Sequence, residues 1–399
     1  VLKNLRITDR NGTLLFSSEN GQIFWHEDAA VRRAVVHVIG DMQGNIGSGL
    51  IYRCREEWID FGYMNGVYTY ANGGCTVLLN IDARLSAAAA KALGEHNGAV
   101  GVFNYQTGEI YAMVSSANFD PLDPPQQAQE GSYLNRFLSA VYTPGSIFKI
   151  VTLQAALESV DGLEDMVFTC KGKCQIGGEI ITCSGTHGKQ DIAAAFANSC
   201  NCAFGELALK VGADKLKETA KRVGLTENGN VDGYVVPAGR VEATDEAAAP
   251  LAWSAIGQHR DTVNPAAFLR YVGAIANGGV AVDLKLRGSL VRGQGAVRPA
   301  PAGESQQVMD PTVAQKLVDY MQNNVVKQYG QNRFGSLVVG AKSGTAQQDN
   351  GAAHSVFTGF VADSQMPIAF FVLAEHAGSG QGVALRVAAS LVDEMKAWQ

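Results

Sequence analysis

The stretch from residue 337 to residue 398 constrains the fold most, because it contains three apolar segments of strand length and then one helix. The strand segments LVVGAKSGTAQ, SVFTGFVA and IAFFVLAEH are rich in β-branched and aromatic residues, and Asn350-Gly351 is a turn signal. VALRVAASLVDEMKAW then repeats apolar residues at helical spacing. The pattern predicts an antiparallel sheet closed by a terminal helix.

Earlier segments add to this sheet. AVGVFNY and EIYAMVS flank Gln106-Thr107-Gly108 and predict a hairpin, and TVLLNI (76–81) predicts a strand before a helix capped by Asp82. Further helices are expected for SIFKIVTLQAALES, NPAAFLRYVGAIANG and TVAQKLVDYMQNNVV, and the chain reads as mostly helical up to about residue 225. We expect a sheet sandwiched by helices, with an all-α lobe inserted between its two halves.

Residues 1–74 have a different composition, which is rich in Gly, Asn and aromatic residues. LLF and AVVHVIG predict short strands there. Because 399 residues exceed one ordinary core, we expect two domains: a small non-catalytic module at 1–74 and a larger domain at 75–399.

Net charge and hydropathy limit the kinds of partner and membrane segment that this sequence predicts. The net charge is -6 with no run of Lys or Arg, so a nucleic-acid partner is not suggested. No stretch approaches the roughly 20 apolar residues that span a bilayer, and no signal peptide is visible. Since the chain opens with Val1, we expect a trimmed piece of a longer protein whose membrane anchor lies upstream.

The segment Ser146-Ile-Phe-Lys149 lies at the expected start of an apolar helix, just after Pro144-Gly145. The spacing of three places the hydroxyl and the amine on one helix face. Apolar neighbours such as Ile150 would lower the pKa of Lys149, so that it can take the serine proton. The pattern predicts Ser146 as nucleophile and Lys149 as base. Taken alone, the motif is better explained by a surface serine beside a solvated lysine, and the order of the motifs is what favours the catalytic interpretation.

The segment Ser199-Cys200-Asn201 falls between two helical stretches. A hydroxyl there could pass a proton to a leaving amine, and an amide could hold a substrate group. The alternative is that Ser199 merely caps the following helix.

The segment Lys342-Ser343-Gly344-Thr345 lies on an expected strand. An exposed edge there could bind an extended peptide by strand addition, with Lys342 and a hydroxyl receiving a terminal carboxylate. Lys342 is also a candidate second cation that lowers the pKa of Lys149. The alternative is a bulge at Gly344 and a solvated edge charge.

The order and separation of these motifs resemble the SxxK, SxN and K[ST]G motifs of the penicillin-binding proteins, the class B type in particular. The similarity covers nearly all of the chain, most densely from 76 to 375, and its further segments are TVLLNIDARLSAAAAKAL, GAVGVFNYQTGEIYAMVSSANFDP, HGKQDIAAAFANSCN, AIANGG, FTGF and the N-terminal RITDRNGTLL. Two departures are KSGT for the commoner KTGT, and His259 after IGQ where Gly is usual.

The resemblance implies an α/β (α+β) fold of the penicillin-binding and serine β-lactamase type, with an antiparallel five-stranded sheet between helices. It implies a serine D,D-transpeptidase that joins a D-Ala-D-Ala stem peptide to an acceptor amine and is acylated by β-lactams, with no catalytic cofactor. By this resemblance, Ser146 is the nucleophile, Lys149 is its base, Ser199 relays a proton and Asn201 orients the substrate amide. The segment Lys342, Ser343, Gly344 and Thr345 binds the substrate carboxylate and contributes to the oxyanion hole. A partner glycosyltransferase and the extracytoplasmic membrane face are further implications.

Five of the seven cysteines lie between residues 170 and 202. Cys170, Cys174, Cys183 and His187 offer three thiolates and one imidazole, which suffice for a closed structural zinc site that would steady the lobe carrying Ser199. A Cys170–Cys183 disulfide and free thiols are the alternatives.

Three rival functions keep the same fold: a β-lactam sensor, a serine β-lactamase and a D,D-carboxypeptidase. We find no motif for the water activation that a β-lactamase needs. A non-enzymatic scaffold of the division or elongation machinery is opposed by the intact SxxK segment.

Overall fold

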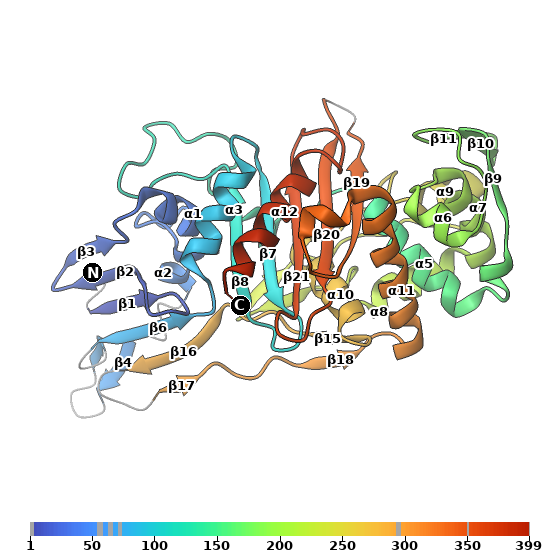
Figure 1. Cartoon of the computed structure of the whole chain (residues 1–399). Helices are drawn as coiled ribbons and strands as arrows, with labels where there is room; N and C mark the ends of the chain where they lie inside the picture. The colour runs from blue at the N-terminus through green and yellow to red at the C-terminus, as the bar shows by residue number, and fades with distance from the viewer. Residues whose placement is uncertain are drawn as a thin grey trace.

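The computed structural model describes residues 4–53, 59–62, 67–70, 74–292, 297–348 and 351–398. Its centre is a five-stranded sheet in the order β19-β20-β21-β7-β8, in which every neighbouring pair is antiparallel. The strands are β7 (Gly98–Asn104), β8 (Ile110–Ser116), β19 (Val339–Ala346), β20 (His354–Val361) and β21 (Ile368–Ala374). This sheet, built from one early hairpin and three late strands, confirms the predicted architecture (Figure 1).

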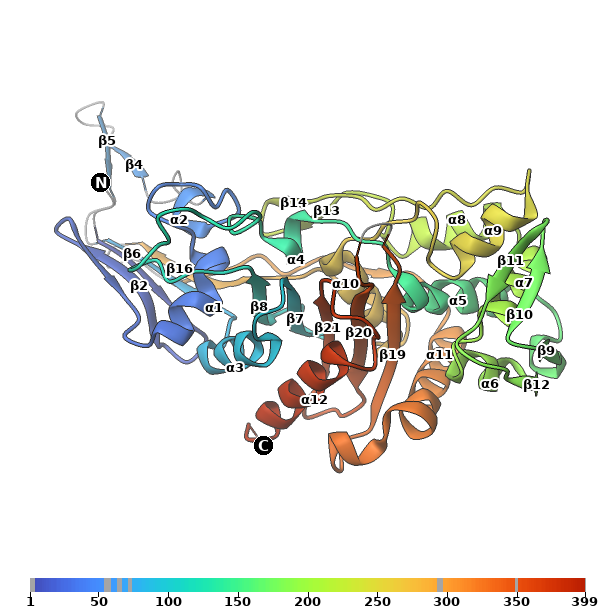
Figure 2. The same ribbon diagram turned by 90° about the horizontal axis from the view of Figure 1, so that it is seen from above.

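Helices cover both faces of the sheet, and this is why strands such as β7, β8 and β21 are buried along their whole length. Figure 2 shows α3 (Ala83–Leu93) and α12 (Val383–Lys396) on one face and α10 (Pro265–Ala276) on the other. Asp82 caps α3 as predicted, since its carboxylate accepts the N–H of Leu85 at 2.9 Å. Helix α11 (Pro311–Asn324) packs beside β19 at the open edge of the sheet.

Part of the chain between β8 and β19 forms a lobe, which carries most of the remaining helices. They are α5 (Lys149–Ser159), α6 (Ile192–Ala197), α7 (Asn201–Val211), α8 (Ala213–Arg222) and α9 (Ala248–Ala255). The expectation of an all-α lobe is wrong in detail, because the lobe also holds two two-stranded sheets. Their strands are β9 (Phe168–Cys170), β10 (Lys173–Ile176), β11 (Glu179–Thr182) and β12 (Gly188–Gln190).

The β10–β11 hairpin has a local cause. Its turn is Gly177-Gly178, with φ of 58° and 88°, and two-residue hairpin turns favour such left-handed backbone. β-branched residues follow at Ile180, Ile181 and Thr182.

The N-terminal part forms a six-stranded sheet in the order β17-β16-β6-β1-β2-β3. Its strands are β1 (Leu5–Thr8), β2 (Leu14–Glu19), β3 (Gln22–Trp25), β6 (Cys75–Leu79), β16 (Arg287–Arg292) and β17 (Arg298–Pro299). Strands from both sides of the expected boundary at residue 74 share this sheet. The division into 1–74 and 75–399 stays a prediction.

The expected strand AVVHVIG is wrong, because this segment forms the end of helix α1 (Ala29–Ile39). Asp28 caps the helix by accepting the N–H of Ala30. The buried Val31, Val35 and Val38 then lie on one face at helical spacing, so packing overrides the β preference of valine.

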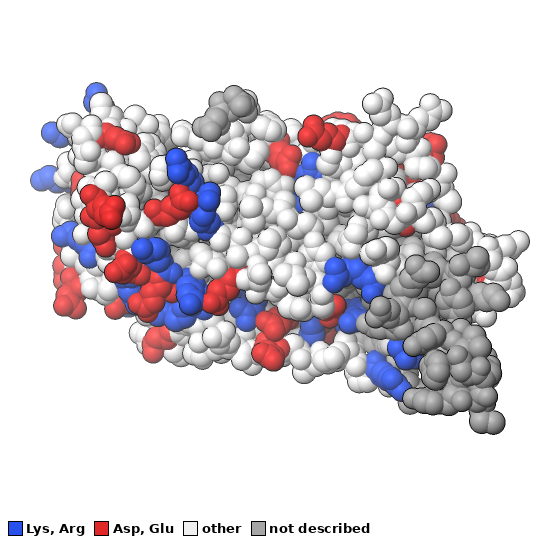
Figure 3. Space-filling view, turned by 180° about the vertical axis from the view of Figure 1, so that it is seen from behind, with Lys and Arg blue, Asp and Glu red and all other residues white. Residues whose placement is uncertain are grey.

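The described residues also contain short α-helices and strands. They are α2 (Leu50–Arg53), β4 (Ile59–Gly62), β5 (Val67–Tyr70), α4 (Arg136–Ser139), β13 (Gly229–Val231), β14 (Tyr234–Val236), β15 (Val280–Val282) and β18 (Ser305–Gln307). The expected turn at Asn350-Gly351 lies partly outside the described residues. Among the described helices, none has the length and apolarity needed to cross a bilayer. On the face shown in Figure 3, basic and acidic side chains intermix over the helical lobe.

Candidate active site

Ser146 lies in a single 3-10 turn, Gly145–Phe148, that leads directly into α5. Strand β19 passes very close to this turn. A side chain at Gly145, whose φ is 59°, would lie 2.7 Å from the carbonyl oxygen of Thr345, and one at Gly344 would lie 3.0 Å from that of Pro144. Gly145 therefore requires glycine, Gly344 leaves little room for a side chain, and this close approach brings the first and third motifs together.

Lys149 is the centre of the site. Its side-chain nitrogen lies 3.1 Å from Ser146 Oγ, 3.1 Å from Ser199 Oγ and 2.6 Å from Asn201 Oδ1. The carbonyl oxygen of Ser199 is a further acceptor at 2.6 Å. The structure thus joins the first two motifs through one amine, although 50 residues separate Lys149 from Ser199 in sequence.

Burial lowers the pKa of Lys149 to about 7, because no exposed surface remains to hydrate the charged form. Lys342 is also fully buried, and burial together with the charge of Lys149 lowers its pKa well below the ordinary value. The Lys342 nitrogen donates to Ser199 Oγ at 3.0 Å. One hydroxyl therefore lies between two lysines, and this geometry can move a proton.

The second motif has an unusual backbone. Ser199 has φ of 52°, a left-handed conformation that costs a non-glycine residue energy and that clusters at functional sites. In this conformation Ser199 presents both its carbonyl and its hydroxyl to Lys149. Ser199 does not cap the next helix, because the cap of α7 is Cys200, whose sulfur accepts the N–H of Ala203.

The third motif lies on β19, the edge strand of the sheet order. Lys342 donates to Ser199. The hydroxyl of Tyr329 lies 3.0 Å from Ser343 Oγ and accepts the Ser343 N–H at 2.9 Å. Thr345 is exposed and its Oγ1 accepts the N–H of Gly380 at 3.2 Å. The structure brings all eight predicted catalytic residues into one region.

A cleft of about 430 Å³ opens over these residues, lined by Ser146, Ser199, Asn201, Ser343 and Thr345. Other lining residues carried no recognisable signal in sequence: Trp253, Gln328, Gln347, Ser379 and Gln381. Gln258 of the IGQ segment also lines the cleft and donates to the carbonyl oxygen of Thr345 at 3.2 Å. These residues come from four separate parts of the chain, so only the fold assembles them.

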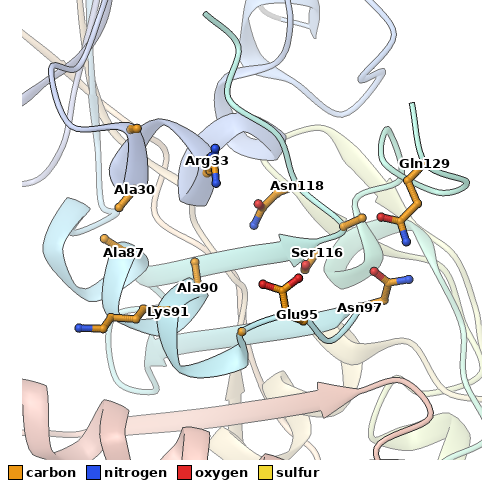
Figure 4. A pocket seen from close by; sticks show the side chains of 13 residues that line it. Ala30, Arg33, Ala87, Ala90, Lys91, Glu95, Asn97, Ser116, Asn118 and Gln129 are labelled. Carbon is orange, nitrogen blue, oxygen red and sulfur yellow. The ribbon is translucent and has the colours of Figure 1, made fainter. Parts of the chain in front are cut away.

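A second groove, of about 490 Å³, lies elsewhere, where α1 faces α3 and the end of β8 (Figure 4). Arg33, Lys91 and Glu95 are among its side chains. None of the three motifs contributes to its lining, so it is separate from the cleft.

The predicted metal ligands are only partly brought together. Cys170, Cys183 and His187 do converge, but the fourth member of the group is Cys200 instead of Cys174. Cys174 interacts instead with the thiol of Cys202. Cys174, on β10, lies outside this group. Within the described residues, Cys170, Cys174, Cys183, Cys200 and Cys202 form no disulfide.

Residues 98–394 match the family model of the penicillin binding protein transpeptidase domain. The chain is 30% identical over 286 residues to the peptidoglycan D,D-transpeptidase PbpA of Mycobacterium tuberculosis, an overlap covering 66% of this chain and 57% of PbpA. It is 31% identical over 304 residues to the stage V sporulation protein D of Bacillus subtilis, covering 70% and 46%. The chain thus spans about half the length of these curated relatives.

Solved structures agree on the fold. A ceftriaxone acyl-enzyme complex of penicillin-binding protein A from M. tuberculosis matches with a TM-score of 0.83 and 22% identity, over 98% of each chain. The D,D-transpeptidase domain of a peptidoglycan glycosyltransferase from Eggerthella lenta matches with a TM-score of 0.82 and 24% identity, over 100% of this chain and 99% of that one.

Proposed function

The chain belongs to the penicillin-binding protein transpeptidase family, and from this premise we propose that it is a serine D,D-transpeptidase that cross-links peptidoglycan stem peptides. The observation that carries the proposal is the contact of Lys149 with Ser146 Oγ at 3.1 Å inside a buried polar cluster. A lysine with a pKa of about 7 is an effective general base near neutral pH.

In the first half-reaction, Ser146 Oγ attacks the carbonyl of the penultimate D-Ala of a donor stem peptide while Lys149 takes the serine proton. The bond to the terminal D-Ala breaks, and that residue leaves as a free amine after receiving a proton through Ser199. An ester on Ser146 remains. In the second half-reaction an acceptor amine attacks this ester, an amide forms, and Ser146 regains its proton.

The remaining residues hold the donor. Asn201 faces the cleft and orients the donor amide, while the edge of β19 pairs with the extended peptide. Ser343 and Thr345 line the cleft and offer hydroxyls to the terminal carboxylate, and the fully buried Lys342 acts on the site through its hydrogen bond to Ser199. Backbone N–H groups of Ser146 and Thr345 stabilise the oxyanion, an interaction that typically contributes about 100-fold or more to the rate.

The setting of the reaction is part of the proposal. The substrate is cell-wall peptidoglycan, so the enzyme works at the extracytoplasmic face of a bacterial membrane, held there by an anchor, and a partner glycosyltransferase supplies the glycan strands. β-Lactams acylate Ser146 in place of the donor.

Labelling with a fluorescent penicillin tests the proposal. We expect a stable covalent adduct on the peptide that contains Ser146, lost in Ser146→Ala and retained in Ser159→Ala, a serine at the exposed end of the same helix. The wild-type protein should also join two stem peptides with release of D-Ala. Rapid turnover of the penicillin would instead indicate a β-lactamase, and labelling with hydrolysis alone would indicate a carboxypeptidase.

A further inference from the structure

We infer that Cys170, Cys183, His187 and Cys200 bind one zinc ion, and that this ion holds the Ser199-Cys200-Asn201 segment in the conformation that contacts Lys149. The second half of this inference rests on the proposed function, whereas the first half does not.

The four potential ligand atoms are arranged compactly. All of them lie within 4.8 Å of one another, and Cys183 Sγ is 3.7 Å from Cys200 Sγ. Zinc–sulfur bonds of about 2.3 Å in a tetrahedron place two sulfurs about 3.8 Å apart. The Cys183–Cys200 separation therefore already fits one edge of a tetrahedral site.

Each of the three thiols also receives a backbone N–H. Gly172 donates to Cys170 Sγ at 3.4 Å, Cys202 donates to Cys183 Sγ at 3.3 Å, and Ala203 donates to Cys200 Sγ at 3.5 Å. Such donors orient the sulfur atoms, as groups around a metal site do.

The fourth group is an imidazole with an unused nitrogen. His187 Nδ1 is buried and has no hydrogen-bond partner among the described residues. A buried polar atom without a partner is costly, and a metal bond would remove that cost. Three thiolates and one imidazole form a ligand set that suits zinc and leaves no open coordination position.

The link to catalysis is Cys200 itself, which stands between the two functional residues of the second motif. Ser199 holds a strained left-handed backbone and directs its carbonyl to Lys149 at 2.6 Å. Asn201 directs its Oδ1 to the same amine at 2.6 Å. An ion that fixes Cys200 fixes both neighbours, since each is one peptide bond away.

The ion would also lie beside the substrate. Cys183 and His187 line the same cleft as Ser146 and Asn201. Loss of the ion would thus loosen one wall of the cleft, and a chelator could reach the site from solvent.

The test compares the intact chain with three single variants. We expect one zinc per chain by elemental analysis in the wild type and in Cys174→Ser, and loss of zinc in Cys170→Ser and Cys200→Ser. Replacement of zinc by cobalt should give thiolate-to-metal charge-transfer absorption in the wild type and in Cys174→Ser, but not in the other two variants. Zinc retained in Cys200→Ser but lost in Cys174→Ser would overturn the ligand set, and a Cys183 disulfide with no zinc in wild type would overturn the site.

A second measurement separates this inference from the proposed function. We expect chelation of the wild-type protein to slow penicillin acylation of Ser146 about tenfold or more, and added zinc should restore the rate. Without chelation, Cys174→Ser should be acylated as fast as the wild type. Zinc binding without any acylation would sink the transpeptidase proposal alone. Acylation that is unchanged after zinc removal would sink the coupling to the second motif.

Discussion

The side-chain nitrogen of Lys149 lies 2.6 Å from Asn201 Oδ1, so the amide of the second motif directly holds the amine of the first. The amide therefore has two tasks, because its Nδ2 also donates to the carbonyl oxygen of Thr182 at 2.7 Å and ties the residue to β11. An amine that is buried in such a hydrogen-bond network can exchange a proton with its partners, while water hydrates it little.

Replacing Lys149 with methionine should abolish acylation while leaving the fold at least as stable. Methionine fills a similar volume and carries no charge, and a fully buried lysine with a pKa near 7 destabilises the folded state at neutral pH. Penicillin labelling should fall by about a thousandfold or more, since the serine loses its base. Lower stability of Lys149→Met in urea unfolding would contradict this account.

The acylation rate should depend on pH through Lys149. Below its pKa of about 7 the amine is protonated and cannot accept the serine proton, so the rate should rise with pH up to about 7 and then level. A lysine with an ordinary pKa would instead give a rate that keeps rising well above pH 9. Stopped-flow penicillin binding between pH 5 and 9 distinguishes the two profiles, with circular dichroism confirming that the protein stays folded.

Asp261 should make the protein less stable as pH rises from about 4 to 6. Burial raises the pKa of this carboxyl from 3.8 to about 6, and its Oδ2 has no partner among the described residues. Between those values the unfolded chain has already released the proton that the folded chain keeps, so the free energy of unfolding falls, by about 3 kcal/mol in total.

The variant Asp261→Asn isolates this effect. An amide keeps an acceptor for the N–H of Glu242 and the hydroxyl of Ser254, which bond to Asp261 Oδ1 at 2.8 and 3.1 Å, but it does not titrate. The stability of the variant relative to wild type should increase from pH 4 to pH 7. Parallel curves for the two proteins would show that Asp261 keeps an ordinary pKa.

Removing Arg136 alone should be strongly destabilising. Its Nε lies 2.8 Å from Glu375 Oε1, and their side chains are only 5% and 16% exposed. Among the described residues, Arg136→Met leaves the buried carboxylate with Tyr142 as its remaining side-chain donor, at a cost of about 3–5 kcal/mol.

Two controls accompany Arg136→Met in the same denaturant titration. The double variant Arg136→Met with Glu375→Met should recover most of the lost stability, because no unpaired charge remains. Asp214→Ala breaks an exposed pair with Lys217 and should change stability by less than about 0.5 kcal/mol. Equal losses in the single and double variants would contradict the unpaired-charge explanation.

The parts of the fold that local chemistry controls were predictable. The hairpin of β7 and β8, the Asp82 cap and the strand–strand–strand–helix order after residue 337 all follow from residues close together in sequence. The same holds for Ser146 and Lys149, because an interval of three residues near a helix start brings their side chains together whatever surrounds them.

Contacts between distant segments were not predictable in this way. Helix α1 was expected as a strand because valine favours strands, yet packing against the neighbouring elements selected the helix. Helix α9 was missed for a similar reason, since it is stabilised mainly by its packing against α7. The β10–β11 hairpin was missed although its Gly177-Gly178 turn is a local signal.

The sequence by itself determined which chemical groups are present and which close neighbours share a face, since backbone geometry sets the direction of side chains a few residues apart. Only the tertiary structure decided that Lys149 and Lys342 are fully buried around one hydroxyl, and that Cys200 replaces Cys174 beside Cys170 and Cys183. The reason is physical: burial, and the pKa changes and ligand geometry that follow from it, depend on long-range packing.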